Sequence, residues 1–193
     1  MSHYFINDQN LVSEIKPFNI NINGISFIFN TDNGVFSKGE LDFGTNLLIK
    51  NVLKLNVSGN ILDLGCGYGP IGIILSKLTN SDVTMSDVNK RAIHLTKMNA
   101  KKNGVSVKVI ESDGYDNIND KFDYVISNPP IRVGKKILYK LLLDTKDHLN
   151  KNGKLIIVVR KEQGALSLIK DMKNNYNIKI LDKEKGFYII SLF

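Results

Sequence analysis

The stretch that decides the fold is Asp63-Leu-Gly-Cys-Gly-Tyr-Gly-Pro70. It follows a short apolar run, Asn60-Ile-Leu62, and precedes a second one, Ile71-Gly-Ile-Ile-Leu75. This pattern predicts a strand, a tight glycine turn and a helix, and Pro70 suits the first helical turn, where its missing N–H is not needed. Alternating glycines let the backbone reach positive φ and approach a ligand closely. Unpaired N–H groups at the start of the helix would face that ligand, so we expect a nucleotide-like cofactor here.

The composition is that of one globular α/β domain. The chain has 193 residues, 42% of them hydrophobic, which is enough to bury a sizeable core. The net charge of +7 fits a polyanionic partner such as nucleic acid, although a lysine-rich composition alone would produce it. The single cysteine, Cys66, excludes an internal disulfide and fits a reducing compartment. Residues 1–8 do not resemble a secretory signal and no apolar run is long enough to span a membrane, so we expect a cytoplasmic protein.

Strand and helix patterns alternate along the chain. Residues 18–22 and 25–29 alternate apolar with polar side chains around Asn23-Gly24, which predicts a β-hairpin with a primed turn. We expect a single domain, 1–193, with an N-terminal β extension (1–35) and a cofactor-binding core (44–193). The predicted core elements are helices 44–55, 70–79, 89–102, 134–149 and 163–174, and strands 60–62, 82–87, 105–110, 122–127, 155–159, 177–181 and 187–193. They predict a Rossmann-like, doubly wound, mostly parallel seven-stranded sheet with an antiparallel C-terminal hairpin.

Two cofactor motifs overlap in the glycine loop. The segment Gly67-Tyr-Gly-Pro-Ile-Gly72 matches the dinucleotide pattern G-x-G-x-x-G, and Asp87 lies near the expected distance downstream. The pattern acid-x-Gly-x-Gly-x-Gly, which begins at Asp63, is instead typical of class I S-adenosylmethionine methyltransferases. A wider loop suits an amino-acid carboxylate and amine better than a pyrophosphate. Because an Asn-Pro-Pro turn and a final antiparallel hairpin do not suit hydride transfer, we favour S-adenosylmethionine.

Three acids follow predicted strands and suit this cofactor. Asp87 can accept both ribose hydroxyls, and Asp113 lies where an adenine amino group could donate. Asp63 can bond loop amides or contact the ligand. Structural roles stay open, because Asp87 could be a helix N-cap and Asp113 a turn residue. The candidate cofactor-binding residues are Asp63, Gly65, Cys66, Gly67, Gly69, Asp87, Val88, Asp113, Gly114 and Asn128.

The candidate catalytic residues are Asn128, Pro129 and Pro130. Proline fixes φ and restricts the preceding residue, so this turn is stiff. An exocyclic amine is a poor nucleophile because its lone pair is delocalised into the ring. The Asn128 side-chain carbonyl and the Pro129 backbone carbonyl can each accept one N–H and so direct the lone pair at a methyl group. The motif implies a planar amine or amide nitrogen and leaves adenine, guanine and a protein glutamine open.

Four blocks of the chain together resemble the RsmC-type small-domain methyltransferases, which are guanine-N2 methyltransferases of small-subunit ribosomal RNA. The blocks are Val35-Phe-Ser-Lys-Gly39, Leu41-Asp-Phe-Gly-Thr45, Asp63–Pro70 and Asn128-Pro-Pro-Ile-Arg-Val-Gly-Lys135. Longer members carry two methyltransferase-like domains, so this chain resembles the short, single-domain members. The resemblance implies S-adenosylmethionine as cofactor, the N2 amine of a guanine in 16S rRNA as methyl acceptor, and rRNA or the small ribosomal subunit as partner.

One departure concerns the residue after Asn-Pro-Pro, which is Ile131. Adenine-N6 and glutamine methyltransferases usually carry an aromatic residue there, so Ile131 disfavours both and leaves base stacking to Phe36 or Phe43. Cations after the turn can hold RNA phosphates. The candidate substrate-binding residues are Phe36, Lys38, Ile131, Arg132 and Lys135. We expect no metal site, because the histidines show no ligand-like spacing. The alternatives are a protein-glutamine or DNA/RNA adenine-N6 methyltransferase, and a catalytically silent RNA-binding or assembly factor.

Overall fold

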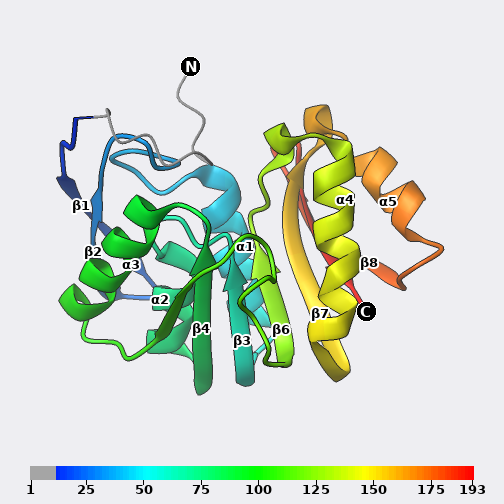
Figure 1. Ribbon diagram of the computed structural model, residues 1–193, viewed down its shortest axis with the longest axis horizontal. Coiled ribbons are helices and arrows are strands. Elements are labelled where there is room, and N and C mark those ends of the chain that lie inside the picture. The colour runs from blue at the N-terminus through cyan, green and yellow to red at the C-terminus, as the bar shows by residue number, and fades with distance from the viewer. Residues whose placement is uncertain (1–11) are drawn as a thin grey trace.

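The computed structural model describes residues 12–193; the predictions on residues 1–11, which concern a secretory signal and the start of the β extension, lie outside this range. A seven-stranded sheet forms its centre, in the order β5-β4-β3-β6-β7-β9-β8 (Figure 1). The strands are β3 (Gly59–Leu64), β4 (Ser81–Asp87), β5 (Lys108–Glu111), β6 (Phe122–Ser127), β7 (Leu149–Arg160), β8 (Ile178–Glu184) and β9 (Phe187–Leu192). Strands β3 to β7 are parallel, and β9 runs antiparallel to both β7 and β8. The predicted Rossmann-like sheet with an antiparallel C-terminal hairpin is confirmed.

Helices cover both faces of this sheet. One face carries α1 (Phe43–Lys54), α2 (Pro70–Leu78) and α3 (Lys90–Lys102), and the other carries α4 (Lys135–Asp144) and α5 (Ala165–Met172). Successive strand residues point to opposite faces of the sheet, so that in β3 Ile61 belongs to one core cluster and Leu62 to the other. Three short 3-10 helices, η1 (Ile131–Val133), η2 (Thr145–His148) and η3 (Lys161–Gln163), complete the connections. Because both faces are covered, β7 can carry a continuous apolar run, from Leu155 to Val159.

Several bounds differ from the predicted ones, and two of these differences have a clear cause. The helix predicted over 134–149 ends at Asp144, and β7 begins at Leu149 rather than at 155. The dipeptide Asn152-Gly153, which is typical of turns, lies inside β7 as an irregularity in its pairing with β6. It separates the first residues of the strand from the apolar run 155–159 on which the prediction rests. Strand β5 begins at Lys108 rather than at 105, since Val105 and Val107 pack against the core without pairing. The apolar pattern at residues 105–107 therefore predicted burial correctly, but it did not predict which residues pair in the sheet.

The predicted N-terminal hairpin is present as a separate two-stranded sheet. Strands β1 (Lys16–Ile22) and β2 (Ile25–Thr31) are antiparallel, and the turn residues Asn23 and Gly24 have φ of 52° and 82°, as a primed turn requires. The hairpin packs on α3 rather than on the main sheet (Figure 1). Its anchor to the core is aromatic, since Tyr68 of the glycine loop lies edge-on to Phe29 at 5.8 Å between ring centroids.

Asn99 of α3 and Asn103, its C-cap, close the edge of β2 that faces this helix. The Asn99 side chain accepts from the backbone N–H of Asn30 at 2.8 Å and donates to its carbonyl at 2.9 Å. Asn103, one helical turn later, accepts from Ile28 N–H at 3.0 Å and donates to Ile28 O at 2.8 Å. Each amide thus replaces one residue of a neighbouring strand. Asn99 also donates to the carbonyl of Tyr68 at 2.8 Å, so a single buried amide joins the hairpin to the glycine loop.

Candidate active site

The candidate site lies at the carboxyl ends of the parallel strands, where open α/β sheets bind their ligands. The glycine loop leaves β3 and turns into α2 (Figure 1). The N–H groups of Gly65 and Cys66 both donate to the carbonyl of Ser86 at 2.9 Å, which ties the loop to the end of β4. At Gly69 φ is 97°, and a Cβ there would lie 2.9 Å from Ile73 Cδ1, so only glycine fits between loop and helix.

Asp63 is fully buried at the end of β3. Its Oδ2 accepts from the N–H of Gly72 at 2.8 Å, whereas its Oδ1 is buried with no hydrogen-bond partner among the described residues. The pKa of Asp63 is raised to about 7: burial raises it most, the Gly72 N–H lowers it, and the nearby Asp87 charge also raises it. An unsatisfied carboxylate oxygen is costly in an apolar environment. It fits a ligand that brings a donor or a positive charge to this side of the loop.

Replacing Asp63 with Asn should change how stability depends on pH. The folded-state pKa of about 7 exceeds the ordinary value of 3.8, so the folded state holds the proton more tightly than the unfolded chain does. Wild-type stability is therefore greatest, with respect to this group, at low pH and falls as the pH rises from about 4 towards 7. We expect the unfolding free energy of Asp63→Asn, relative to that of wild type, to be higher at about pH 8 than at about pH 5 when both are measured with urea and without cofactor. An identical difference at both pH values would contradict this titration.

Asp87, at the end of β4, holds two loops together. Its Oδ2 accepts from Gly67 N–H and its Oδ1 from Asn89 N–H, both at 2.8 Å. Burial raises the pKa of Asp87, and these backbone N–H groups, with that of Val88, lower it. The N-cap of α3 is Asn89, whose side chain accepts from Arg91 N–H at 2.9 Å, so Asp87 is not the helix cap. Its carboxylate instead faces the glycine loop.

The remaining predicted cofactor residues lie beside these acids. The Ser112 N–H donates to the carbonyl of Asp87 at 3.0 Å, which brings the turn with Asp113 and Gly114 to the end of β4. Asp113 is exposed. Cys66 is buried with Sγ 3.6 Å from Thr96 Oγ1, and burial raises the pKa of its thiol well above the ordinary value. The thiol stays protonated at neutral pH, in keeping with a small loop residue rather than a nucleophile.

Asn128 follows β6 and has a fixed side-chain orientation. Its Nδ2 donates to Thr45 Oγ1 at 2.9 Å and to Asp42 Oδ2 at 3.4 Å. The same Asp42 oxygen caps α1 by accepting from Thr45 N–H at 2.9 Å, and it accepts from the Thr45 hydroxyl at 3.3 Å. Because that hydroxyl proton is directed at Asp42, Thr45 Oγ1 can only accept from Asn128. Reversing the amide would set its oxygen against the carboxylate, so Oδ1 faces away from both residues and is used by no hydrogen bond within residues 12–193.

Sequence patterns did not identify Asp42 and Thr45 as site residues. Both lie in the block Leu41–Thr45 that carries the family resemblance, and Asp42 has the form of a helix N-cap. That cap is what the structure shows, but the same carboxylate also faces Asn128, which lies 86 residues further along the chain. A cap signal alone gives no hint of this second contact.

The predicted substrate-binding residues fall into two groups. Phe36 and Lys38 lie in the segment before α1, where the Lys38 ammonium contacts Glu14 at 2.6 Å and Asn33 at 2.7 Å. This segment borders the glycine loop, since Tyr68 Oη donates to Glu40 O at 3.2 Å. The others follow the Asn-Pro-Pro turn: Ile131 and Arg132 form part of η1, and Lys135 begins α4 and pairs with Asp171 at 2.7 Å.

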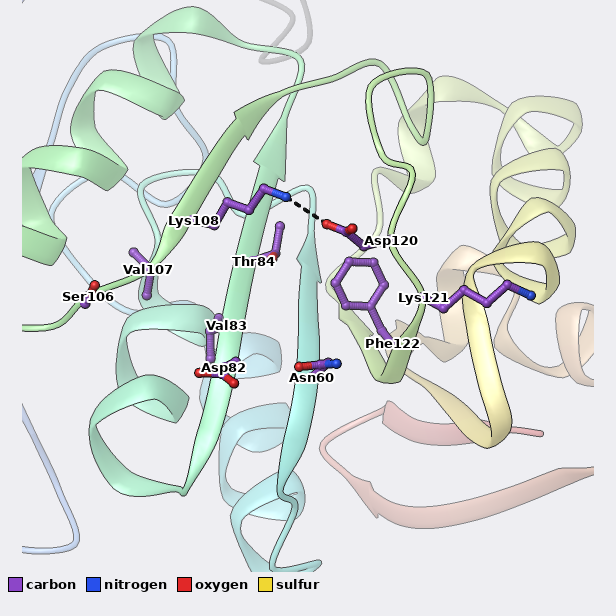
Figure 2. A pocket seen from close by; sticks show the side chains of 10 residues that line it. All are labelled: Asn60, Asp82, Val83, Thr84, Ser106, Val107, Lys108, Asp120, Lys121 and Phe122. Carbon is purple, nitrogen blue, oxygen red and sulfur yellow. Dashed lines mark hydrogen bonds and ion pairs between the residues drawn. The ribbon is translucent and has the colours of Figure 1, made fainter.

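A pocket lies at the opposite, amino ends of the strands. Figure 2 shows Asn60 of β3, Asp82 of β4 and Phe122 of β6 around it, with the ion pair of Lys108 and Asp120 at 2.7 Å across it. It is separate from the acids of the glycine loop. Within residues 12–193 there is no cluster of three or more possible metal ligands, and no helix there is long and apolar enough to cross a membrane.

This architecture is that of the Rossmann-like methyltransferases. The family model "Methyltransferase small domain" matches residues 26–191, and the chain belongs to this family. It is 39% identical to the "Uncharacterized protein YbxB" of Bacillus subtilis (strain 168), over 97% of this chain and 96% of that protein. The resemblance to RsmC-type enzymes is also confirmed: the chain is 37% identical over 75% of its length to "Ribosomal RNA small subunit methyltransferase C" of Haemophilus influenzae (strain ATCC 51907 / DSM 11121 / KW20 / Rd).

Among solved structures, the chain is similar to "T. Thermophilus 16S rRNA N2 G1207 methyltransferase (RsmC) in complex with AdoMet and Guanosine". The TM-score is 0.82 over 92% of this chain and 50% of that one, at 21% identity, which shows a shared fold. The chain spans 45% of the Haemophilus influenzae enzyme. It therefore corresponds to about half of these longer relatives.

Proposed function

We propose that this methyltransferase transfers a methyl group from S-adenosylmethionine to the exocyclic N2 of a guanine in small-subunit rRNA. The observation that carries the proposal is the fixed orientation of Asn128, whose amide nitrogen is held by Thr45 and Asp42 while its oxygen faces away. An acceptor oxygen beside a glycine loop suits a planar amine, which must present two N–H groups and a lone pair in defined directions.

The residues around the glycine loop fit S-adenosylmethionine. The unpartnered Oδ1 of buried Asp63 suits the ammonium group of the cofactor's amino-acid part. Each carboxylate oxygen of Asp87 accepts one hydrogen bond from a backbone N–H and can accept a further one from a ribose hydroxyl. Asp113 and Gly114 are the proposed adenine contacts. The remaining proposed contacts use main-chain atoms and come from Gly65, Cys66, Gly67, Gly69 and Val88. When bound, the cofactor supplies a methyl group activated by its sulfonium.

The proposed mechanism relies on positioning. Asn128 Oδ1 and the Pro129 carbonyl each accept one N–H of the N2 amine, which raises the electron density on nitrogen and directs its lone pair. Pro130 keeps this turn rigid. Nitrogen forms the new bond to carbon as the carbon–sulfur bond breaks, and the surplus proton then passes from nitrogen to solvent. No strong base is needed before attack, so the chain contributes orientation and two acceptor dipoles.

Guanine is preferred over the alternatives for two reasons. Ile131, in place of an aromatic residue, disfavours adenine-N6 and glutamine as acceptors. One relative of this chain is named as a ribosomal RNA small subunit methyltransferase, and the similar solved structure is named for its N2 G1207 activity. An rRNA substrate also implies a cytoplasmic location and a net attraction of the +7 chain to RNA.

Methyl-labelled S-adenosylmethionine tests this function directly. The full chain is incubated with naked small-subunit rRNA, small subunits, DNA or a release factor, and labelled RNA is digested to nucleosides for mass spectrometry. We expect label in RNA as N2-methylguanosine. Label in DNA or protein alone, or N6-methyladenosine in RNA, would replace the proposal with the corresponding alternative. Cofactor binding without any label would identify a silent RNA-binding factor.

Replacing Thr45 with Val should slow methyl transfer while leaving cofactor binding intact. Valine keeps the shape of threonine but removes the oxygen that accepts from Asn128 Nδ2 at 2.9 Å. A loosened amide misplaces its acceptor, which we expect to lower kcat by about tenfold to a hundredfold. Thr45→Ser restores the oxygen and should restore most of the rate. A lowered rate in Thr45→Ser with a normal rate in Thr45→Val would mean that Thr45 acts only through the packing of its methyl group.

A further inference from the structure

The turn between β8 and β9 uses a lysine where another residue would be favoured. Lys185 and Gly186 have φ of 47° and 81°, nearly the values of 52° and 82° at Asn23 and Gly24 in the N-terminal hairpin. Both are two-residue turns, since Glu184 pairs with Phe187 and Ile22 pairs with Ile25. Asparagine tolerates positive φ and is preferred at the first position of such turns, whereas lysine is not. A disfavoured residue in a turn points to a role for its side chain.

The Lys185 side chain lies on an aromatic pair. Its ammonium is 4.8 Å from the ring centroid of Phe43, and the Phe43 and Phe187 centroids are 5.4 Å apart. The guanidinium of Arg160, at the end of β7, lies 5.4 Å from the Phe187 centroid. We name these four residues, Phe43, Arg160, Lys185 and Phe187, the aromatic–basic platform. A cation over a ring is held in place, so less conformational entropy is lost when it binds a second partner.

The charge of the platform is largely available to a ligand. No carboxylate of residues 12–193 forms an ion pair with Lys185. Arg160 Nε contacts Glu162 at 2.7 Å, but the two side chains are 50% and 66% exposed, and such exposed pairs are weak. Lys185 and Glu184 are themselves exposed. The platform therefore presents two cations to solvent, and Glu162 is a weak ion-pair partner that a phosphate can displace from Arg160.

The platform adjoins the catalytic turn. Phe43 begins α1 two residues before Thr45, whose hydroxyl holds Asn128. The ring of Phe187 lies against the backbone between them, because a Cβ on Gly44 would be 2.8 Å from Phe187 Cε1. Arg160 ends a parallel strand, as Ser127 does just before Asn128, so both lie at the same edge of the sheet.

We propose that the aromatic–basic platform binds the phosphate backbone of the RNA that flanks the target nucleotide. This proposal rests on the proposed function, which supplies RNA as the substrate. Phosphates are the groups that the platform fits, because its rings are occupied by cations rather than left open for base stacking. A guanine presented to Asn128 would have its neighbouring backbone within reach of the same edge of the molecule. Backbone contacts of this kind position the substrate without reading its sequence.

The variant Lys185→Asn tests the platform because it separates stability from binding. It recreates the Asn-Gly turn of the N-terminal hairpin, so we expect a melting temperature equal to or above that of wild type. Binding of the full chain to fluorescently labelled, naked small-subunit rRNA fragments should weaken about threefold to tenfold at low salt. The slope of log K against log salt should fall by about 1, as for one lost phosphate contact. Arg160→Gln should act in the same way.

Lys179→Asn is the matched control, since Lys179 is an exposed lysine at the other end of β8. It should bind RNA like wild type. Unchanged affinity and salt slope in Lys185→Asn would overturn the proposal. Normal binding to naked rRNA with impaired methylation of assembled subunits would also overturn it and assign the platform to a ribosomal protein. Failure of the proposed function is seen separately, as absence of RNA methylation by wild type.

Discussion

Asn128→Ala should reduce methyl transfer by about 10²- to 10³-fold, the loss usually seen when one preorganised polar contact to the reacting group is removed. The variant lacks the side-chain oxygen that is proposed to accept from the acceptor amine, while Pro129 keeps its carbonyl. Asn128 is half-buried and its partners are Thr45 and Asp42, which still pair with each other in the variant. The fold and the glycine loop should therefore be unaffected, and cofactor affinity should change little.

Single-turnover methylation and calorimetric cofactor titration measure the two quantities separately. Asn60→Ala is a suitable control, because Asn60 is exposed at the opposite, amino end of β3. Full activity in Asn128→Ala would remove this residue from the mechanism. An equal loss of cofactor affinity and rate would assign it to cofactor binding instead.

Asp87→Ala should instead weaken cofactor binding by about a hundredfold. The carboxylate anchors the N–H groups of Gly67 and Asn89 at 2.8 Å, and it is the proposed acceptor for the ribose hydroxyls. Two hydrogen bonds to a charged acceptor, at about 1.5 kcal/mol each, correspond to roughly this factor. At saturating cofactor the transfer rate should recover in large part, because Asp87 does not face the methyl acceptor in the proposed site.

The control for Asp87 is its neighbour in the sheet. Glu111 pairs with Asp87 in the register of β4 and β5, carries the same charge and is exposed. Glu111→Ala should keep wild-type cofactor affinity, as measured by calorimetry. If Asp87→Ala also kept it, the carboxylate would be a loop anchor and nothing more.

Local pattern was sufficient for the sheet and for the acids at its edge. The glycine loop, the strand ends at Asp63 and Asp87, and the Asn-Pro-Pro turn are signals that a few adjacent residues carry. Parallel topology then places them at one edge, because the carboxyl ends of neighbouring strands meet there. These features required no knowledge of side-chain contacts.

What sequence could not supply is pairing between distant side chains. Thr45 and Asn128 are 83 residues apart, and Asn99 and Asn30 are 69 apart. Nothing in either neighbourhood indicates that an amide on α3 completes a strand edge or that a helix cap orients a catalytic side chain. Lys185 is similar, since its turn was visible in the sequence but its contact with Phe43 was not.

The contacts of Asn99 limit how far the N-terminus of this protein can be truncated. A chain that began at α1 would keep the glycine loop and every proposed cofactor residue, yet it would lose the backbone that fills the Asn99 and Asn103 amides. The ring of Tyr68 would lose its contact with the fully buried Phe29 and would be exposed to water. For recombinant expression or domain grafting, the smallest unit worth making therefore starts before β1.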